Sequence, residues 1–572
     1  MYSPQSLPPA PVAQLLLEAT THYQQGRLAD AEAVCTRILQ QAPDSPDAPH
    51  LLGLVQLKQG KADAALSFID ASLKIDPRSP NALASRGRAL AALNRTSEAL
   101  ASFEASLALA PNDPDTLSNR GSMLLSLERP AEALEALDRA AALAPRHFGA
   151  LINRGNALAL LGRLDAALAQ YDALVDAHPT RAELHFNRGN ALAGLSRHAE
   201  AIAAFDRALA SQPNYVRAHI NRGAALQAIN QHRDALASFA NAVRMDRTNH
   251  DVRHNAALSL LTLGEYRPGF IQYEMRQSNM PPRRRSFGTA AWLGESAPTG
   301  QTLLLHAEQG FGDTVQFIRY APLVAGLGAR IVLEAPVELL SLLQQVDGIA
   351  EIVGEGGPLP AFDLHCPLPS LPLAMRTELA TIPAQIPYLK ASEERIAQWR
   401  ARLAPVRAPR VALAWSGRAT HLNDRNRSLA LARLAPLFTL DEISFISIQH
   451  EMRAEDAGTL AGLPRITDVG KELHDFEDTA AVLALADLVI SVDTSVAHLA
   501  GAIGRRTWIL LPFSPDWRWM LERTDSPWYP TARLYRQPAL GDWDGVVAGL
   551  RAGLKRLLDG GPGAPGAPTF AR

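Results

Sequence analysis

The fold of the first half of the chain is decided by residues 148–181, FGALINRGNALALLGRLDAALAQYDALVDAHPTR. Within this stretch, Gly155 is followed twelve residues later by Ala167, and such small residues let two helices cross at short range. Pro179 stands near the end of the stretch. A proline ends a helix because it cannot continue the hydrogen-bond ladder. The stretch therefore predicts two packed helices.

The same residue types recur every 34 residues on both sides of this stretch. The glycines are Gly53, Gly87, Gly121, Gly155, Gly189 and Gly223, and the prolines are Pro43, Pro77, Pro111, Pro145, Pro179 and Pro213. The alanines are Ala31, Ala65, Ala99, Ala133, Ala167, Ala201 and Ala235, and the leucines are Leu90, Leu124, Leu158, Leu192 and Leu226. Phe103, Tyr171, Phe205 and Phe239 share one position of the second helix, where we expect them to fill the space between repeats. Four series with one period indicate a repeat.

This pattern resembles the tetratricopeptide repeat, a helix–turn–helix unit of 34 residues. The resemblance implies an α-solenoid over residues 12–280. We expect seven full repeats, starting near Val12, Pro46, Pro80, Pro114, Phe148, Ala182 and Val216. An eighth repeat, from His250, has Ala257 in place of the glycine, which suits a terminal repeat that packs on something else.

One further series is not needed for packing. It consists of Asn119, Asn153, Asn187, Asn221 and Asn255, all at the sixth position of the first helix of a repeat. A side-chain amide both donates and accepts, so a ladder of amides on the concave face can hold the backbone of a peptide acceptor of any sequence. A similar ladder occurs in the repeats of protein O-linked N-acetylglucosamine transferases. Alternatively, asparagine is common at this position and only supports neighbouring turns.

The composition is typical of a globular protein of several domains, which we expect to be cytoplasmic. The 572 residues include 56 basic and 58 acidic side chains, so nucleic acid is not an expected partner. No segment has the roughly 18 consecutive apolar residues of a membrane span, and residues 1–11 lack the pattern of a secretory signal. Two cysteines, Cys35 and Cys366, exclude a disulfide framework.

The pattern changes near Met280, and a linker at 281–300 carries Arg283–Arg285, which we interpret as a solvated connector. Short β-rich runs then alternate with helical stretches, which predicts an α/β region with parallel sheets. Strands are expected at 302–306, 330–334, 349–353, 410–415, 443–448, 487–492 and 507–512, and helices at 314–327, 393–403 and 479–486. The Pro-containing stretch 404–409 divides the region into lobes at 301–404 and 405–558, followed by a disordered tail at 559–572. Ligands bind at the carboxyl ends of the strands in such sheets.

The first polar group follows the strand at 302–306. Gly310 and Gly312 allow a tight turn and bring backbone N–H groups to a ligand. Asp313 opens the next helix, either as its cap or as a reactive carboxylate at the mouth of the cleft.

Two further groups follow later strands. Ser416 and the nearby Arg427 predict a phosphate site, unless their loop is only solvated, and Gln449, directly after another strand, joins these donor-binding candidates. Asp493, Thr494 and Ser495 open a helix whose N–H groups face an anion. His498 lies one turn further, either at this site or as a core or capping histidine.

Together, the first and last groups resemble the two signatures of the lipopolysaccharide heptosyltransferase family, over roughly residues 300–557. The resemblance implies a GT-B fold of two Rossmann-like lobes and an inverting, metal-independent transfer from a nucleotide sugar, without a cofactor. Asp313 would be the general base, and Asp493, Thr494, Ser495 and His498 would hold the donor.

This chain departs from the family pattern at two places. Ser495 stands where the family usually has glycine. The family often has a lysine that contacts the donor phosphates, and for that role this chain has only Arg425 or Arg427. No cluster of His, Asp and Glu has metal-ligand spacing, and no P-loop motif is present.

The leading hypothesis is a protein glycosyltransferase whose repeats hold a polypeptide acceptor. Flagellin is an attractive acceptor, because bacterial transferases of this layout glycosylate it. The first alternative is a transferase acting on a glycan or a lipid-linked sugar, with repeats that recruit a complex. The second is a non-catalytic repeat scaffold.

Overall fold

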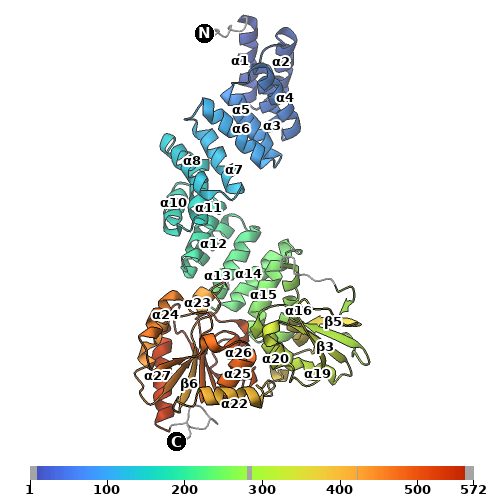
Figure 1. The fold of residues 1–572 in the computed structure, drawn as a ribbon. Coiled ribbons are helices and arrows are strands. Elements are labelled where there is room, and N and C mark those ends of the chain that lie inside the picture. Colours follow the sequence, from blue (N-terminus) through green and yellow to red (C-terminus); the bar gives the residue numbers. More distant parts are fainter. Residues whose placement is uncertain (1–9, 280–286, 421–422, 561–572) are drawn as a thin grey trace. The chain divides into compact units, whose positions relative to one another are not determined.

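The structure, a computed structural model, describes residues 10–279, 287–420 and 423–560. The predicted connector Arg283–Arg285 and nearly all of the predicted tail lie outside these residues. The chain divides into two compact units, residues 1–218 and 219–572 (Figure 1).

The first unit consists of consecutive helix pairs. Its helices are α1 (Ala10–Gln24), α2 (Leu28–Gln41), α3 (Asp47–Lys58), α4 (Ala62–Ile75), α5 (Pro80–Ala92), α6 (Thr96–Leu109), α7 (Pro114–Ser126), α8 (Pro130–Leu143), α9 (Phe148–Leu160), α10 (Leu164–Ala177), α11 (Ala182–Gly194) and α12 (His198–Ser211). Helices α5, α7, α9 and α11 begin at the predicted repeat starts, and each second helix ends two residues before its proline. The 34-residue period therefore sets both ends of the helices.

The repeating glycines make room for the second helix of the same repeat. A methyl group added to Gly87 would lie 2.5 Å from the ring of Phe103, and one added to Gly155 would lie 2.6 Å from the ring of Tyr171. Both rings are buried. Each ring packs closely on the glycine sixteen positions earlier in its own repeat, and the cluster that contains Phe103 also packs against side chains of both neighbouring repeats.

A series of ion pairs, outside the patterns described above, joins neighbouring repeats of the first unit. The pairs are Arg86–Asp70 at 2.8 Å, Arg120–Glu104 at 3.2 Å, Arg154–Asp138 at 2.6 Å and Arg188–Asp172 at 2.6 Å. In two of them the arginine also donates to the second helix of its own repeat, to Ser102 from Arg86 and to Gln170 from Arg154. Such an arginine connects three helices.

The second unit begins with the remaining repeats and continues into two sheets. Helix α13 (Val216–Ala228) crosses the boundary between the units, and the helices that follow are α14 (His232–Met245), α15 (His250–Thr262), α16 (Tyr266–Tyr273) and α17 (Arg276–Asn279). Helix α16 is short, in keeping with a degenerate eighth repeat.

The first sheet contains five parallel strands in the order β1-β5-β2-β3-β4. They are β1 (Ala290–Ala291), β2 (Thr302–His306), β3 (Arg330–Ala335), β4 (Ile349–Gly354) and β5 (Leu364–Pro367). Helices α18 (Phe311–Phe317), α19 (Ala321–Ala325), α20 (Leu340–Leu343) and α21 (Leu371–Ala374) accompany them. The helical stretch predicted at 314–327 is present as α18 and α19, which a 3₁₀ turn at Ile318–Tyr320 joins.

The second sheet contains six parallel strands in the order β11-β10-β9-β6-β7-β8. They are β6 (Arg410–Ala414), β7 (Ser444–Ser447), β8 (Ile466–Asp468), β9 (Leu488–Val492), β10 (Thr507–Leu511) and β11 (Ala532–Arg536). The helices are α22 (Glu393–Arg402), α23 (Asp424–Arg427), α24 (Ala454–Ala461), α25 (Phe476–Ala484), α26 (Ser495–Ala502) and α27 (Trp543–Leu558). Every residue of β9 and β10 is buried, as in a parallel sheet covered on both faces.

Among the described helices, none has the length and apolar character that a membrane span requires. The two cysteines, Cys35 and Cys366, are both buried and free.

Candidate functional site

The strand order points to the carboxyl ends of the strands as the place for a ligand. Counted from β6, the second sheet has the order 3-2-1-4-5-6 of doubly wound folds, and the order reverses between β6 and β9. In the first sheet it reverses between β2 and β5. The segments after β2, β6 and β9 carry Asp313, Ser416 and Asp493, and ligands bind outside such reversal points.

Asp313 lies in the first turn of α18, and the N-cap of that helix is Gly310. The capping alternative for Asp313 is therefore wrong. Its carboxylate instead accepts a hydrogen bond from the guanidinium of Arg518. Burial raises the pKa of Asp313 and Asp516 raises it further, while Arg518 opposes them. The site thus holds a carboxylate that is costly to ionise beside a cation that favours its ionised form.

Asp493, Thr494 and Ser495 connect β9 to α26, and no side chain caps α26 at its N-terminus. The hydroxyl of Thr494 lies 3.2 Å from that of Ser491. Burial, with Asp516 nearby, raises the pKa of Asp493 to about 7. At neutral pH this carboxyl carries a proton much of the time, so the N–H groups of α26 face a position that an anion can approach.

The segment after β6 contacts the segment after β9. Arg427 donates from Nη1 to the backbone oxygen of Asp493 at 2.9 Å. The Oγ of Ser416 has no hydrogen-bond partner among the described residues, and the Nε of Arg427 has none beyond an ion pair with Asp424 at 3.8 Å. Gln449 uses its amide on backbone groups, accepting from the N–H of Ser416 at 3.1 Å and donating to its carbonyl at 2.9 Å. Arg427 and Ser416 can therefore serve a ligand, whereas Gln449 supports Ser416.

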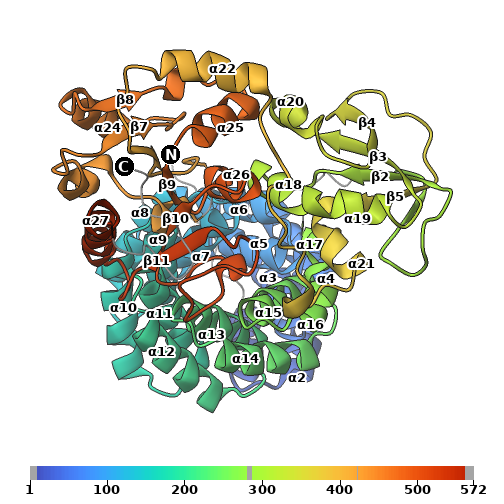
Figure 2. The same ribbon diagram turned by 90° about the horizontal axis from the view of Figure 1, so that it is seen from below.

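His498 is buried where α18 meets α26, which lie side by side in Figure 2. Its Nδ1 is 2.9 Å from the hydroxyl of Tyr529, and its ring stacks on Trp519 with centroids 5.4 Å apart. Burial lowers the pKa of His498 well below its usual range, so it is neutral. A methyl group on Gly312 would lie 2.9 Å from this ring. Close packing therefore requires Gly312, and neither Gly310 nor Gly312 has a positive φ, so neither position needs the backbone freedom of glycine.

Arg518 and Trp519 belong to the site but were not predicted. They lie in a 3₁₀ turn, Trp517–Trp519, in the segment that follows β10. Arg518 is buried, pairs with Asp313, and is 2.9 Å from Asp516. The indole of Trp519 interacts with the carboxylate of Asp493 and lowers its pKa against the effect of burial. The signal available in the sequence was an arginine between two tryptophans, in the segment that follows a strand of a parallel sheet.

The five ladder asparagines lie on successive first helices of the repeats and are half-buried. Asn119, Asn153 and Asn187 belong to the first unit, and Asn221 and Asn255 to the second. The amide of Asn187 donates to Asn156 at 3.2 Å, and the hydroxyl of Tyr171 donates to the same oxygen at 2.7 Å. Asn187 is thus already engaged, and the acceptor-binding role of the series stays a prediction.

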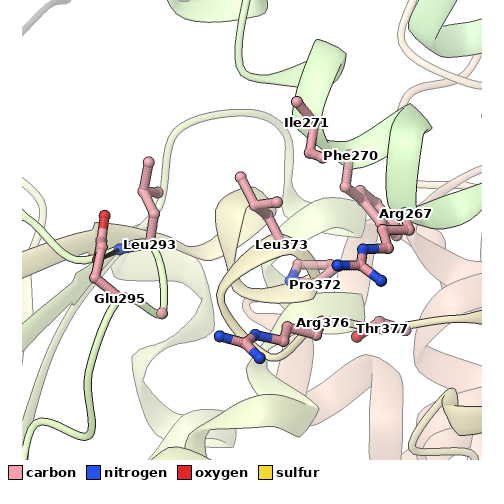
Figure 3. A pocket seen from close by; sticks show the side chains of 10 residues that line it. Arg267, Phe270, Ile271, Leu293, Glu295, Pro372, Leu373, Arg376 and Thr377 are labelled. Carbon is pink, nitrogen blue, oxygen red and sulfur yellow. Dashed lines mark hydrogen bonds between the residues drawn. The ribbon is translucent and has the colours of Figure 1, made fainter.

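A pocket of ≈ 300 Å³ lies apart from these residues, between α16, the loop after β1, and α21 (Figure 3). Phe270, Ile271 and Leu373 give it an apolar lining that also includes Arg267 and Arg376. None of the predicted site residues lines it.

Within the described part of the chain, no group of three or more His, Cys, Asp or Glu side chains is arranged to hold a metal ion. Asp542 and Asp544 have the Asp-x-Asp spacing of metal-using transferases, but both have structural roles here. Asp542 caps α27 through the N–H of Gly545 at 2.8 Å, and Asp544 pairs with Arg433 at 2.9 Å.

Comparison with known proteins identifies the helical repeats. Models of the tetratricopeptide repeat match residues 22–89 and 80–113, and also 118–182, 161–216 and 186–250. The helices of these residues are tetratricopeptide repeats. The match confirms the sequence-based interpretation of the N-terminal half.

A curated protein, FlbA of Caulobacter vibrioides, is 27% identical over 331 residues, which cover 52% of this chain and 54% of that protein. The chain therefore spans about half the length of this relative.

Solved structures of repeat proteins are also similar. A tetratricopeptide repeat protein from Parabacteroides merdae is 19% identical, with 44% of this chain and 98% of that chain covered and a TM-score of 0.35. YrrB, described as having an unusual peptide-binding site, is 26% identical, with 32% and 95% covered and a TM-score of 0.30. At such TM-scores neither likeness bears on the function of this chain.

Proposed function

We propose that this protein is a glycosyltransferase that moves a sugar from a nucleotide-sugar donor to a polypeptide acceptor held by its repeats. The observation that carries the proposal is the meeting of α18 and α26, which brings Asp313 of one parallel sheet toward the Asp493–Ser495 segment of the other. We assign the two sheets to the two lobes of a GT-B fold, expected at 301–404 and 405–558, and β1 extends the first lobe into the predicted linker, to Ala290.

The proposed donor site uses the segments after β6 and β9. The N–H groups of α26 and the guanidinium of Arg427 would face the diphosphate, and the Oγ of Ser416 would gain the partner it lacks. A partly protonated Asp493 would repel this anion less than a fully ionised carboxylate. A nucleotide sugar therefore suits the charges of the site, and neither a metal nor a cofactor is required.

The proposed chemistry is a single displacement with inversion. An acceptor hydroxyl forms a bond to the anomeric carbon, the bond from that carbon to the phosphate oxygen breaks, and the hydroxyl proton passes to Asp313. Arg518 contacts Oδ1 of this carboxylate, so we assign the proton to Oδ2. A carboxylate placed in this way contributes about 10²–10⁴-fold to the rate.

The acceptor part of the proposal rests on the repeats. Tetratricopeptide repeats present helical surfaces on which peptides or proteins bind, and the half-buried asparagines supply donors and acceptors there. Flagellin remains the proposed acceptor class, through the layout of repeats followed by a transferase.

The decisive experiment is a transfer assay with purified full-length protein. UDP-, GDP- and CMP-linked sugars are offered with secreted surface proteins, and intact mass is measured. We expect an increase in the mass of the acceptor protein. The rate of this transfer should be about 10²–10⁴-fold lower in Asp313→Asn. Because asparagine keeps an oxygen that accepts from Arg518, this variant should fold and bind donor. Full turnover by a well-folded Asp313→Asn protein would refute the general-base role.

One observation favours the second candidate, a non-catalytic scaffold. The ion pair with Arg518 already engages the carboxylate that should act as the base. A scaffold would show no turnover with any of the nucleotide sugars, yet it would bind the same partner proteins. Turnover that disappears in Asp313→Asn eliminates it.

A further inference from the structure

The last repeats of the second unit contact the loop that carries Arg518. Asn230, in the turn after α13, donates to the backbone oxygen of Phe513 at 2.7 Å. Ser514 donates to the backbone oxygen of Gln227 at 3.1 Å. Phe513 and Ser514 belong to the segment between β10 and Arg518, so this turn fixes the start of that segment.

Helix α16 fixes the end of the same segment through aromatic packing. Phe270 and Tyr273 lie 5.7 and 6.3 Å from Trp517, measured between ring centroids, and Tyr266 accepts a hydrogen bond from the indole of Trp528 at 3.2 Å. All five rings are buried. Trp517 directly precedes Arg518, so its packing determines where the guanidinium points.

A buried arginine connects the other loop of the site to the same repeat. Arg276, at the start of α17, donates to both carboxylate oxygens of Glu308 at 2.9 Å, and it also pairs with Glu274 at 2.6 Å and with Ser370. The hydroxyl of Tyr273 donates to Gln309 at 3.3 Å. Glu308 and Gln309 lead directly into Gly310 and Asp313.

We propose that the last two repeats position Arg518 against Asp313 and so are a working part of the transferase site. The positioning residues, which we call the terminal clamp, are Asn230, Tyr266, Phe270, Tyr273 and Arg276. The clamp holds the loops of both sheets through two different sets of contacts. The effect of the clamp on the rate of sugar transfer rests on the proposed function. Its effect on the position of the two loops does not depend on that function.

Asn230 allows a matched test in the full-length protein. Asn94 occupies the same repeat position in the first unit, and both residues have a left-handed backbone, with φ of 61° and 58°. Glycine keeps that conformation and removes the side chain. In hydrogen exchange without any ligand, we expect Asn230→Gly to speed exchange of the amides at 512–520 about fivefold, the loss of roughly one hydrogen bond. Asn94→Gly, whose side chain is exposed, should leave these amides unchanged.

Arg276 tests the second set of contacts. The variant Arg276→Gln with Glu308→Gln avoids a buried unpaired carboxylate at 308, and it should speed exchange at 308–313. Arg276→Lys keeps the cation and should restore slow exchange in part. In the transfer assay, kcat should fall at least about tenfold in the double variant while the donor KM stays unchanged, as expected for loss of positioning alone.

The outcomes separate the two proposals. Unchanged exchange at both loops, or the same change in Asn94→Gly, overturns the clamp whatever the enzyme does. Faster exchange in a protein that turns over no nucleotide sugar supports the clamp and refutes the proposed function. A rise in donor KM with an unchanged kcat would make Arg276 part of donor binding instead, and would also overturn its positioning role.

Discussion

Arginine is used in two different ways in the two units. In the first unit, Arg154 and Arg188 keep 33% and 28% of their side-chain surface exposed, and each pairs with one carboxylate of the preceding helix. In the second unit, Arg276, Arg319 and Arg518 are buried and make several hydrogen bonds each. The repeats of the first unit have similar half-exposed ion pairs at regular intervals along the chain. The site region of the second unit instead has a few buried arginines with several hydrogen bonds each.

The difference follows from solvation. An ion pair near the surface is screened by water and contributes about 0–1 kcal/mol, whereas loss of one partner from a buried pair costs about 3–5 kcal/mol because the other charge remains buried. Arg319 extends the contrast, since it satisfies its guanidinium with the carbonyl of Trp528 at 2.7 Å and the hydroxyl of Tyr388 at 2.8 Å. Replacement of these buried arginines of the second unit should therefore be far less tolerated than replacement of the arginines that pair repeats in the first.

The largest expected effect is that of Arg518→Met, set against Arg154→Met. We expect Arg518→Met to lower the unfolding free energy of the second unit by about 3–5 kcal/mol, and Arg154→Met to lower that of the first by at most about 1 kcal/mol. All eight tryptophans lie in the second unit, so their fluorescence in a urea titration reports that unit, and circular dichroism reports both. Equal losses of unfolding free energy in the two variants would contradict this difference between the two units.

Asp493→Asn sharpens the comparison through pH. With a pKa of about 7 in the folded protein against 3.8 for the free group, the folded state binds more protons than the unfolded state between these values. Its stability should therefore fall as pH rises through this window, by up to about 1.4 kcal/mol per pH unit. Asp493→Asn removes the titration, so it should unfold at a higher temperature than the native protein at pH 8 and at about the same temperature near pH 4.

The control for this experiment is Asp176→Asn, an exposed position of the first unit. It should leave the pH profile of tryptophan fluorescence unchanged. If native protein and Asp493→Asn show parallel profiles between pH 4 and 8, Asp493 does not titrate in this window.

The smallest effect is expected for the asparagine series of the first unit. Replacing Asn119, Asn153 and Asn187 with alanine should weaken acceptor binding by about 0.5–1.5 kcal/mol for each hydrogen bond lost, with little change in stability. The measurement is calorimetric titration with the protein that gains mass in the transfer assay. Alanine at the exposed Asn81 and Asn112 is the control. Unchanged affinity in the triple variant would make the series a feature of the repeat alone.

Much of the fold could be predicted because its signals are local. The 34-residue series predicted the helix starts at Pro80 and Phe148, and the buried apolar run at Thr302–His306 matched β2. β5 was missed because its four residues lie inside a Pro-rich stretch and end at Pro367. β11 was missed because it is an edge strand that carries two arginines among its five residues and lacks an apolar run.

The sequence could predict the site residues that one segment of the chain places by itself, but not the contacts between distant segments. Asp313 and Asp493 stand after strands, so the sheet topology predicts their place. The contact between Asp313 and Arg518 joins residues 205 positions apart, and no pattern within either segment encodes it. The burial of His498 likewise depends on Tyr529 and Trp519, which come from other segments.

The ion pairs of the first unit have a consequence for how such a chain changes length. Each pair joins residues sixteen positions apart across a repeat boundary. Deleting residues 80–113 would place Asp70 sixteen positions before Arg120 and so restore a pair of the same kind. Duplication of one repeat would create another. Recombination in steps of 34 residues can thus lengthen or shorten the solenoid without breaking its electrostatic pairing, whereas any other step leaves an arginine facing the wrong helix position.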